Sequence, residues 1–165
     1  MNEITTIIYT DGSCLKNPDG PGGWAFAVVD TTKKRDDGLH DYHCKSGGAS
    51  VTTNNRMEMT AVIEALKSHI NQNDIVGSSS SKLRIFSDSQ YVINGITKWM
   101  SGWIRNNWRT ASGGNVKNHD LWLKINNLLE ELGREVEFKW VKGHANNPYN
   151  TIVDELARNE ALKAQ

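Results

Sequence analysis

The spacing of apolar residues changes about one third of the way along the chain. Up to about residue 54 the apolar runs are short and rich in β-branched residues: ITTIIYTDGS, PGGWAFAVVD and a third run over residues 39–47. Turn-forming Asn, Pro, Asp and Gly separate the first two runs, and the charged sequence KKRDDG between the second and third is typical of an exposed hairpin tip. Because these connections are short, we expect three antiparallel strands.

From Asn55 the apolar residues recur at intervals of three and four, which predicts an amphipathic helix. The positions are Met59, Val62, Ile63, Leu66 and Ile70. Residues 71–81 then read as a polar loop, LRIFSD as a buried strand, and the stretch from Tyr91 as a second helix. A further amphipathic helix ends at Gly133, VEFKWV is the last strand, and Pro148 begins the last helix.

The predicted order is therefore three strands, a helix, a strand, two helices, a strand and a helix. Helices between the later strands require crossover connections and hence parallel pairing. We expect an α/β fold: a five-stranded mixed sheet, three strands antiparallel and then two parallel, with helices on both faces. At 165 residues the chain is predicted to form a single domain, residues 1–165.

The charge balance argues against a generic nucleic-acid binder, because 19 basic and 19 acidic side chains cancel. Any affinity for nucleic acid must come from local charge separation, and residues 94–124 show it. That stretch contains Lys98, Arg105, Arg109, Lys117 and Lys124 against the single acid Asp120.

The sequence also predicts a cellular setting. The start MNEITTIIYTDG lacks the pattern of a signal peptide, and no apolar run approaches the ~20 residues of a membrane-spanning helix. Cys14 and Cys44 lack a CxxC spacing and are expected to be free thiols. We therefore expect a cytoplasmic protein with no membrane partner.

Four acidic residues lie at the seams of the predicted elements. Asp11 and Asp88 each end an apolar run, Glu58 opens a helix, and Asp154 lies in the last helix. Carboxylates are rarely placed near a core unless a cation accompanies them. Asp11 and Asp88 follow strands, at the edge where α/β sheets place ligand sites. If the fold brings the four together, Mg²⁺ is the natural ion to offset their repulsion.

Each acid also has a purely structural interpretation. Asp11 fits an ordinary Asp-Gly turn, and Asp88 lies near a helix cap. Asn55 followed by Glu58 resembles a capping box, and Asp154 lies beside the apolar stripe of its helix, where it could simply be solvated. Taken singly, Asp11 and Asp88 fit both interpretations equally, whereas Glu58 and Asp154 favour the structural one.

Six segments, in order, resemble bacterial type 1 ribonuclease H over nearly the whole chain: YTDGSCLKNPDGPGGWAF, TTNNRMEM, FSDSQYVINGI, KWMSGWIRNNWRT, VKNHDLW and WVKGHANNPYNTIVDELA. The resemblance implies a ribonuclease H-like fold. It also implies an endonuclease that hydrolyses the RNA strand of an RNA–DNA hybrid and leaves 5′-phosphate and 3′-hydroxyl ends. The implied catalytic residues are Asp11, Glu58, Asp88 and Asp154, the metal ligands, together with His144.

Two Mg²⁺ ions about 3.5–4 Å apart could clamp a scissile phosphate between them. Asp11 would bridge both ions, Asp88 and Glu58 would hold the ion on the nucleophile side, and Asp154 would complete the leaving-group side. Both ions are expected with substrate bound, and Mn²⁺ is a possible substitute. His144, in the loop sequence KGHANNP, is suited to assist proton transfer, but by itself could be a surface histidine. The sequence around it offers no second ligand for zinc.

The resemblance further implies how the hybrid duplex, the expected partner, is bound. Amide side chains would contact the minor groove and its 2′-hydroxyls, two residues would bind a DNA phosphate, and a basic, tryptophan-bearing handle would hold the DNA strand. The groove residues are Asn17, Asn54, Asn55 and Gln90, the phosphate residues are Thr53 and Asn118, and the handle tryptophans are Trp99, Trp103 and Trp108. The asparagines also suit turns and caps, and the tryptophans could pack in the core; we expect one or two packed and at least one lining the channel.

Three features depart from the family pattern. The handle is less basic than is usual, the polar stretch over residues 71–81 is long, and Tyr149-Asn150-Thr151 replaces acidic residues that are common before the last helix. Fewer phosphate contacts predict a shallower salt dependence of binding.

Other functions remain open from the sequence alone. A resolvase or transposase core shares the expected fold, although the short chain disfavours a transposase. A hybrid-binding module without catalysis would be expected to lack one of the four acids, and a structural role leaves their co-occurrence unexplained. No exposed apolar stripe requires a partner subunit, so a monomer is expected.

Overall fold

A computed structural model of the chain describes residues 5–76, 82–143 and 146–165, except for the side chains of residues 72–76. The elements are β1 (Thr5–Cys14), β2 (Gly20–Lys34), β3 (His40–Thr52), α1 (Asn54–Val76), β4 (Lys82–Ser87), α2 (Gln90–Asn94), the π-helical turn η1 (Gly95–Trp99), α3 (Met100–Arg105), α4 (His119–Leu132), β5 (Val136–Trp140) and α5 (Pro148–Lys163). Apart from the division of one helical segment into α2, η1 and α3, this is the predicted order.

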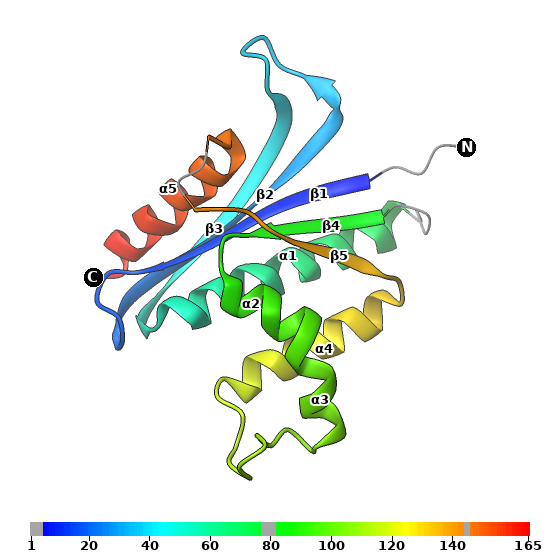
Figure 1. Cartoon of the computed structure of the whole chain (residues 1–165). Helices are drawn as coiled ribbons and strands as arrows, with labels where there is room; N and C mark the ends of the chain where they lie inside the picture. Colours follow the sequence, from blue (N-terminus) through cyan, green and yellow to red (C-terminus); the bar gives the residue numbers. More distant parts are fainter. Residues whose placement is uncertain (1–4, 77–81, 144–145) are drawn as a thin grey trace.

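One sheet with the strand order β3-β2-β1-β4-β5 forms the centre of the molecule (Figure 1). β1 pairs with β2 and β2 with β3 in antiparallel fashion, whereas β1 with β4 and β4 with β5 are parallel. The mixed sheet that the sequence predicts is therefore confirmed. The two parallel pairings matter for function because they align the carboxyl ends of β1, β4 and β5 at one edge.

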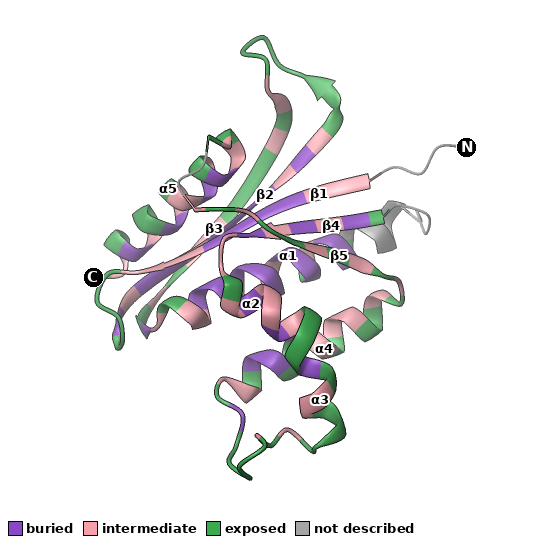
Figure 2. Cartoon of the chain, in the orientation of Figure 1, coloured by how far each residue is buried: buried purple, intermediate pink, exposed green. Residues whose placement is uncertain are grey.

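Helices cover both faces of the sheet, and the alternation of residues along β1 shows why. Ile8 packs with residues of α1, α2 and α4, such as Val62, in the larger apolar cluster. Its neighbour Tyr9 points to the other face and packs with Val153 and Ala157 of α5. Figure 2 shows the buried residues along the middle strands and on the helix sides that face them. Side chains of successive strand residues point to opposite faces, so one strand serves two apolar layers.

Several observed boundaries differ from the predicted ones. β1 stays paired with β2 through residues 11–14 and ends at Cys14, one residue beyond the predicted run ITTIIYTDGS. β2 runs to Lys34, four residues beyond the predicted run PGGWAFAVVD. β3 runs to Thr52, five residues beyond the predicted end at 47. α1 continues to Val76, into the stretch predicted as a loop over residues 71–81. The polar residues there favour a loop when considered alone, but a helix that is already nucleated can continue through them.

The predicted end of α4, the predicted start of α5 and the two predicted free thiols are confirmed. Gly133 ends α4 in the left-handed conformation (φ 69°), and Pro148 occupies the first turn of α5 after the capping residue Asn147. Cys14 and Cys44 are free thiols, as expected. Across the described ranges, no helix combines the length and the apolar character needed to cross a membrane.

Candidate active site

Asp11 and Asp88 meet where two parallel strands end their pairing. The last parallel pair between β1 and β4 is Thr10 with Ser87, and each acid is the next residue along the chain. Asp11 remains paired with Ala25 of β2, so its interpretation as part of a turn is wrong. The helix that follows Asp88 is capped by the hydroxyl of Ser89, which accepts a hydrogen bond from the Val92 amide at 3.2 Å, rather than by Asp88.

Glu58 reaches the same place from the second turn of α1. The capping-box interpretation is wrong, because the cap is Thr53, whose hydroxyl accepts a hydrogen bond from the Arg56 amide at 3.1 Å. Glu58 Oε1 instead accepts a hydrogen bond from the Gly12 amide at 2.9 Å, and Ser87 donates to Oε2 at 3.4 Å. Its carboxylate is therefore held against the ends of β1 and β4.

A close approach of α1 to β1 makes this geometry possible. A Cβ atom on Gly12 would lie 2.3 Å from the amide nitrogen of Glu58 and 2.4 Å from the carbonyl carbon of Met57. Only a residue without a side chain fits between the strand and the helix here. Gly12 thus sets the distance between Asp11 and Glu58.

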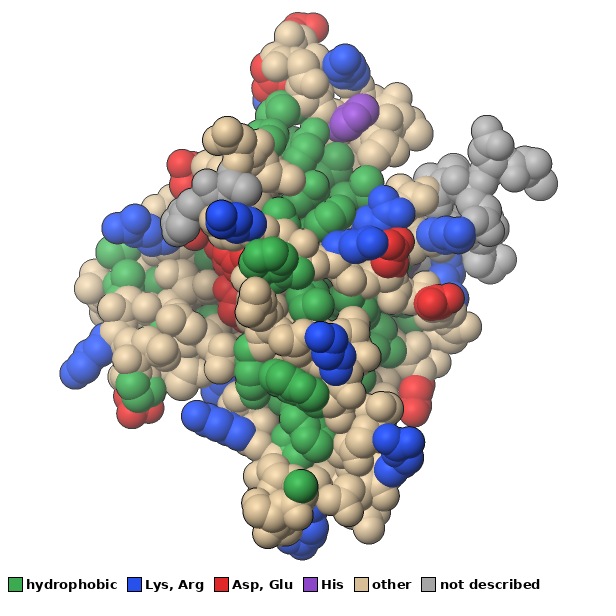
Figure 3. Space-filling view, viewed as in Figure 1, with side chains coloured by type: hydrophobic (Ala, Val, Ile, Leu, Met, Phe, Trp, Pro, Cys, Tyr) green, Lys and Arg blue, Asp and Glu red, His purple; other side chains and the backbone are tan. Residues whose placement is uncertain are grey.

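Three carboxylates form a compact cluster. One oxygen each from Asp11, Glu58 and Asp88 lie within 4.8 Å of one another, with Asp11 and Glu58 buried and Asp88 half-buried. On the face seen in Figure 3, acidic atoms gather in a recess beside α5, close to the middle of the molecule. Asp154 of α5 is half-buried and near enough to Asp11 to contribute to the raised pKa of its carboxyl group. The fold therefore gathers three of the four acids that the sequence suggests in one cluster of oxygens, and Asp154 lies near Asp11 outside that cluster.

The electrostatics of the cluster are unfavourable without a cation. Burial raises the pKa of Asp11, and the neighbouring carboxylates of Glu58 and Asp88 raise it further. Burial also raises the pKa of Glu58, against the lowering effect of the hydrogen bonds that it accepts. Raised carboxyl pKa values mean that the ionised cluster destabilises the folded state.

The residues present fit a hard divalent cation. Oδ2 of Asp11 is buried and has no hydrogen-bond partner among the described residues, although a buried carboxylate oxygen normally has one. The cluster offers only carboxylate oxygens, the donors preferred by Mg²⁺. A cation coordinated there would satisfy this oxygen and offset the repulsion.

The amide residues that the resemblance assigns to the hybrid lie around this cluster. Asn17 Oδ1 accepts a hydrogen bond from the Asn54 amide at 3.1 Å, which ties the β1–β2 turn to the start of α1. Asn17 and Asn54 are exposed and Asn55 is half-buried. Gln90 is exposed at the first position of α2, two residues beyond Asp88. Asn17 therefore has a structural role, because it links the turn to the helix, and its side chain also remains accessible.

Thr53 and Asn118 are linked through Arg56. The Arg56 guanidinium donates to Asn118 Oδ1 at 3.3 Å and forms a two-bond ion pair with Asp120, at 2.9 and 2.7 Å. Asn118 also donates to the hydroxyl of Tyr91 at 3.0 Å. This network was not predicted from the sequence. Arg56 and Asp120 are 64 positions apart, so no local pattern indicates their contact.

Two of the three tryptophans of the handle are packed, as expected, and the predicted place of a third along the substrate channel stays a prediction. Trp103 and Trp108 pack against the larger apolar cluster, whereas Trp99 is 40% exposed. The ring of Trp103 lies 5.9 Å from that of Trp99 and 5.4 Å from that of the buried Trp122, which connects the exposed ring to the core. The predicted auxiliary residue His144 lies outside the described residues. Gly143 before it approaches Asp88, since a Cβ there would lie 3.3 Å from Oδ2.

Known proteins are similar in sequence to this chain over nearly its whole length. A family model described as "RNase H" matches residues 3–162. "Ribonuclease H" of Treponema pallidum subsp. pallidum is 43% identical over 164 residues, covering 95% of this chain and 90% of that protein.

Solved structures of other proteins share the fold of this chain. The crystal structure of LC9-RNase H1, "a type 1 RNase H with the type 2 active-site motif", has a TM-score of 0.75 at 28% identity and covers all of this chain and 75% of that one. The crystal structure of LC11-RNase H1 "in complex with RNA/DNA hybrid" has a TM-score of 0.69 at 23% identity and covers 97% and 99%. This last likeness supports the fold alone.

Replacing Gly12 tests the close approach of α1 to β1. Gly12→Ala should lower the free energy of unfolding by about 3 kcal/mol or more, because backbone atoms of α1 must move to admit the methyl group. Urea denaturation measures the change. Gly114→Ala is the matched control, since its Cβ would meet only the Thr110 hydroxyl at 3.5 Å, and it should change stability by less than about 0.5 kcal/mol. Equal effects of the two substitutions would contradict this account.

Replacing Asp11 tests the repulsion. In chelator at pH 7, Asp11→Asn should raise the free energy of unfolding by about 1–3 kcal/mol, because the buried carboxyl group must take up a proton on folding and the amide need not. A carboxyl whose folded-state pKa is raised favours the protonated folded state, so the wild type loses stability as pH rises above its unfolded pKa. The gain should therefore vanish near pH 4. Asp36→Asn, at the exposed hairpin tip, is the control and should show no such gain. A destabilised Asp11→Asn protein would show that the cluster is not under repulsion.

Proposed function

This chain belongs to the ribonuclease H family, in its type 1 group, and we propose that Asp11, Glu58, Asp88 and Asp154 hold the Mg²⁺ with which it cleaves RNA in RNA–DNA hybrids. The observation that carries this proposal is the cluster of carboxylate oxygens within 4.8 Å at the ends of two parallel strands. The proposed reaction is endonucleolytic hydrolysis of the RNA strand that leaves 5′-phosphate and 3′-hydroxyl ends.

The four acids differ in how they would serve the ions. We assign Asp11 as the shared ligand of two ions when substrate is bound, because it interacts with all three other acids and its buried Oδ2 has no hydrogen-bond partner among the described residues. Glu58 and Asp88 would hold one ion, and Asp154 would complete the site of the other. When bound, Mg²⁺ supplies positive charge at the scissile phosphate and makes the attacking water more acidic. Mn²⁺ is proposed as a possible substitute.

The protein contributes rigid placement of these ligands. Glu58 is held in one orientation by the Gly12 amide and the Ser87 hydroxyl. Asp11 Oδ1 accepts a hydrogen bond from the same amide at 2.9 Å, so one backbone N–H contacts two ligands. Because both carboxylates are fixed before substrate arrives, little reorganisation accompanies the reaction. His144 is proposed to assist proton transfer or product departure.

Recognition of the hybrid follows from the accessible residues around the cluster. Asn17, Asn54, Asn55 and Gln90 would contact base edges and 2′-hydroxyls in the minor groove, where amides can both donate and accept. Thr53 and Asn118 would bind a DNA phosphate, with Asn118 oriented by its bonds to Arg56 and Tyr91. Trp99, Trp103 and Trp108 would form the handle for the DNA strand, with the exposed Trp99 in direct contact. A monomer in the cytoplasm remains our expectation.

A cleavage assay tests this proposal directly. Labelled RNA–DNA hybrid, double-stranded RNA and double-stranded DNA are each incubated with Mg²⁺ or with chelator. We expect cleavage of the RNA strand of the hybrid only, abolished by chelator and reduced at least about 10³-fold by Asp11→Asn. Asp36→Asn should cleave as the wild type does. If the wild type binds hybrid but leaves it intact with Mg²⁺, the protein is a binding module instead.

The role of His144 has its own test. His144→Ala should lower kcat by about 10- to 100-fold while cleavage remains detectable, because an assisting proton carrier contributes less than the metal ligands. Steady-state kinetics on the hybrid measures kcat and KM separately. Complete loss of cleavage would give His144 an essential role, and an unchanged kcat would remove it from the mechanism.

A further inference from the structure

Trp140 is an exposed aromatic residue that forms a hydrogen bond with a residue of the candidate site. It is the last residue of β5, pairs with Ser87 of β4, and has 46% of its surface exposed. Its indole N–H donates a hydrogen bond to the main-chain oxygen of Asp88 at 3.0 Å. A large, half-exposed tryptophan thus contacts the backbone of one of the proposed metal ligands.

The hydrogen bond from Trp140 to Asp88 lies just beyond the last residue pair of β4 and β5. The last main-chain bond between these two segments runs from the Val141 amide to the Ser87 oxygen, at 2.9 Å. Asp88 comes one residue later, between the end of β4 and the cap of α2, so the indole adds a side-chain bond beyond the sheet. Gly143 lies against the Asp88 carboxyl group, where a Cβ would be 3.3 Å from Oδ2. The end of β5 therefore holds the backbone of Asp88, and Gly143 after it lies near the Asp88 carboxyl group.

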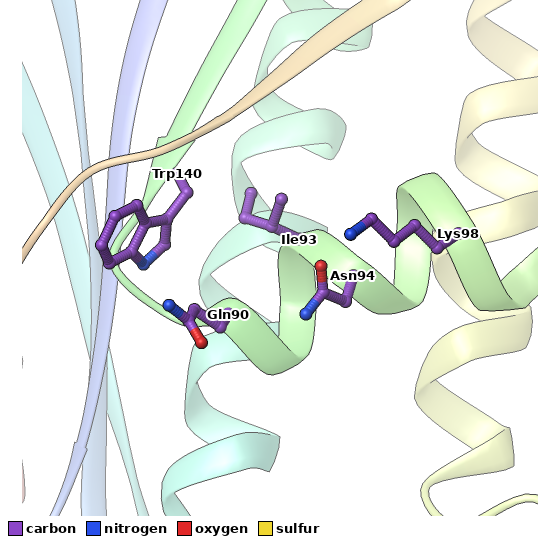
Figure 4. A pocket seen from close by; sticks show the side chains of 5 residues that line it. All are labelled: Gln90, Ile93, Asn94, Lys98 and Trp140. Atoms are coloured by element: carbon purple, nitrogen blue, oxygen red, sulfur yellow. The ribbon is translucent and has the colours of Figure 1, made fainter.

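Trp140 also lines a shallow pocket of about 310 Å³. The other lining residues are Gln90, Ile93, Asn94 and Lys98, which lie along α2 and η1 on the side of the indole (Figure 4). An aromatic ring, two amides and an ammonium group suit a nucleotide, with its flat base, its hydroxyls and its phosphate. Gln90 is only two residues beyond Asp88, so a strand with a phosphate at the acids can continue into this pocket.

We propose that Trp140 is a positioning residue for Asp88, and that its exposed ring contacts the RNA strand next to the cleaved phosphate. This inference rests on the proposed function. The indole N–H holds the Asp88 backbone in the orientation that presents its carboxylate to the cluster. Contact of the strand with the other side of the ring then links occupation of the pocket to the placement of Asp88.

Two substitutions separate these roles. Trp140→Phe keeps an aromatic ring but removes the N–H donor, and Trp140→Ala removes both. Trp24→Phe, a half-buried tryptophan on β2 that stacks on Phe26, is the matched control for loss of an indole elsewhere. Mg²⁺ binding is measured by calorimetry without substrate, hybrid binding by fluorescence anisotropy in EDTA, and folding by thermal denaturation.

We expect Trp140→Phe to weaken Mg²⁺ binding by about 3- to 10-fold, the size expected for one lost hydrogen bond, with hybrid affinity in EDTA within about twofold of the wild type. Trp140→Ala should weaken Mg²⁺ binding at least as much and hybrid binding by about 5-fold or more. Trp24→Phe should change neither constant. Wild-type Mg²⁺ affinity in Trp140→Phe would overturn the positioning role, and wild-type hybrid affinity in Trp140→Ala would overturn the contact with the strand.

A spectroscopic measurement on the unmodified side chain keeps the test independent of folding defects. The indole ¹⁵N–¹H signal of Trp140, assigned by its loss in Trp140→Phe, should shift on titration with Mg²⁺, while that of Trp24 should not. An unchanged signal in a protein that binds Mg²⁺ and cleaves hybrid would refute the inference alone. A wild type that neither binds Mg²⁺ nor cleaves would instead refute the proposed function.

Discussion

Repulsion between carboxylates that the fold holds together is the interaction on which this site depends. Asp11 and Glu58 are buried, Asp88 is beside them, and burial together with mutual repulsion raises the pKa of the first two. Such an arrangement costs stability and persists only because rigid elements impose it. β1 and β4 end together, and the missing side chain of Gly12 lets α1 approach β1 closely. The same rigidity prepares the site for divalent cations, because the ligands need not be gathered when the ion binds.

The surroundings of the cluster are organised by contacts that span long stretches of sequence. Arg56 joins the first turn of α1 to the first turn of α4 through Asp120 and Asn118. Trp140 joins β5 to the start of the segment that carries Gln90. Both contacts place an accessible side chain, Asn118 in one case and the indole in the other, within the surface proposed to bind the hybrid. In the proposed function, metal binding and recognition of the duplex therefore depend on the same strand and helix ends.

Much of this arrangement could be predicted from the sequence. The change from short β-rich runs to helical spacing predicted the element order, and parallel pairing of the later strands placed Asp11 beside Asp88. The resemblance to type 1 ribonuclease H added Glu58 and Asp154, which local patterns alone favoured as cap and solvated residues. What could not be predicted depends on tertiary contact. Pairing with β2 extends β1 past its apolar run, α1 continues through polar residues, and Trp140 finds Asp88 across 52 positions.

The central claim is that these carboxylates form one site for divalent cations. Crystals soaked in Mn²⁺, with anomalous scattering recorded at the manganese edge, test it most directly. The account predicts an anomalous peak coordinated by oxygens of Asp11, Glu58 and Asp88, with Asp154 at its border. Peaks only at other places on the surface, or carboxylates too far apart to share an ion, would contradict it.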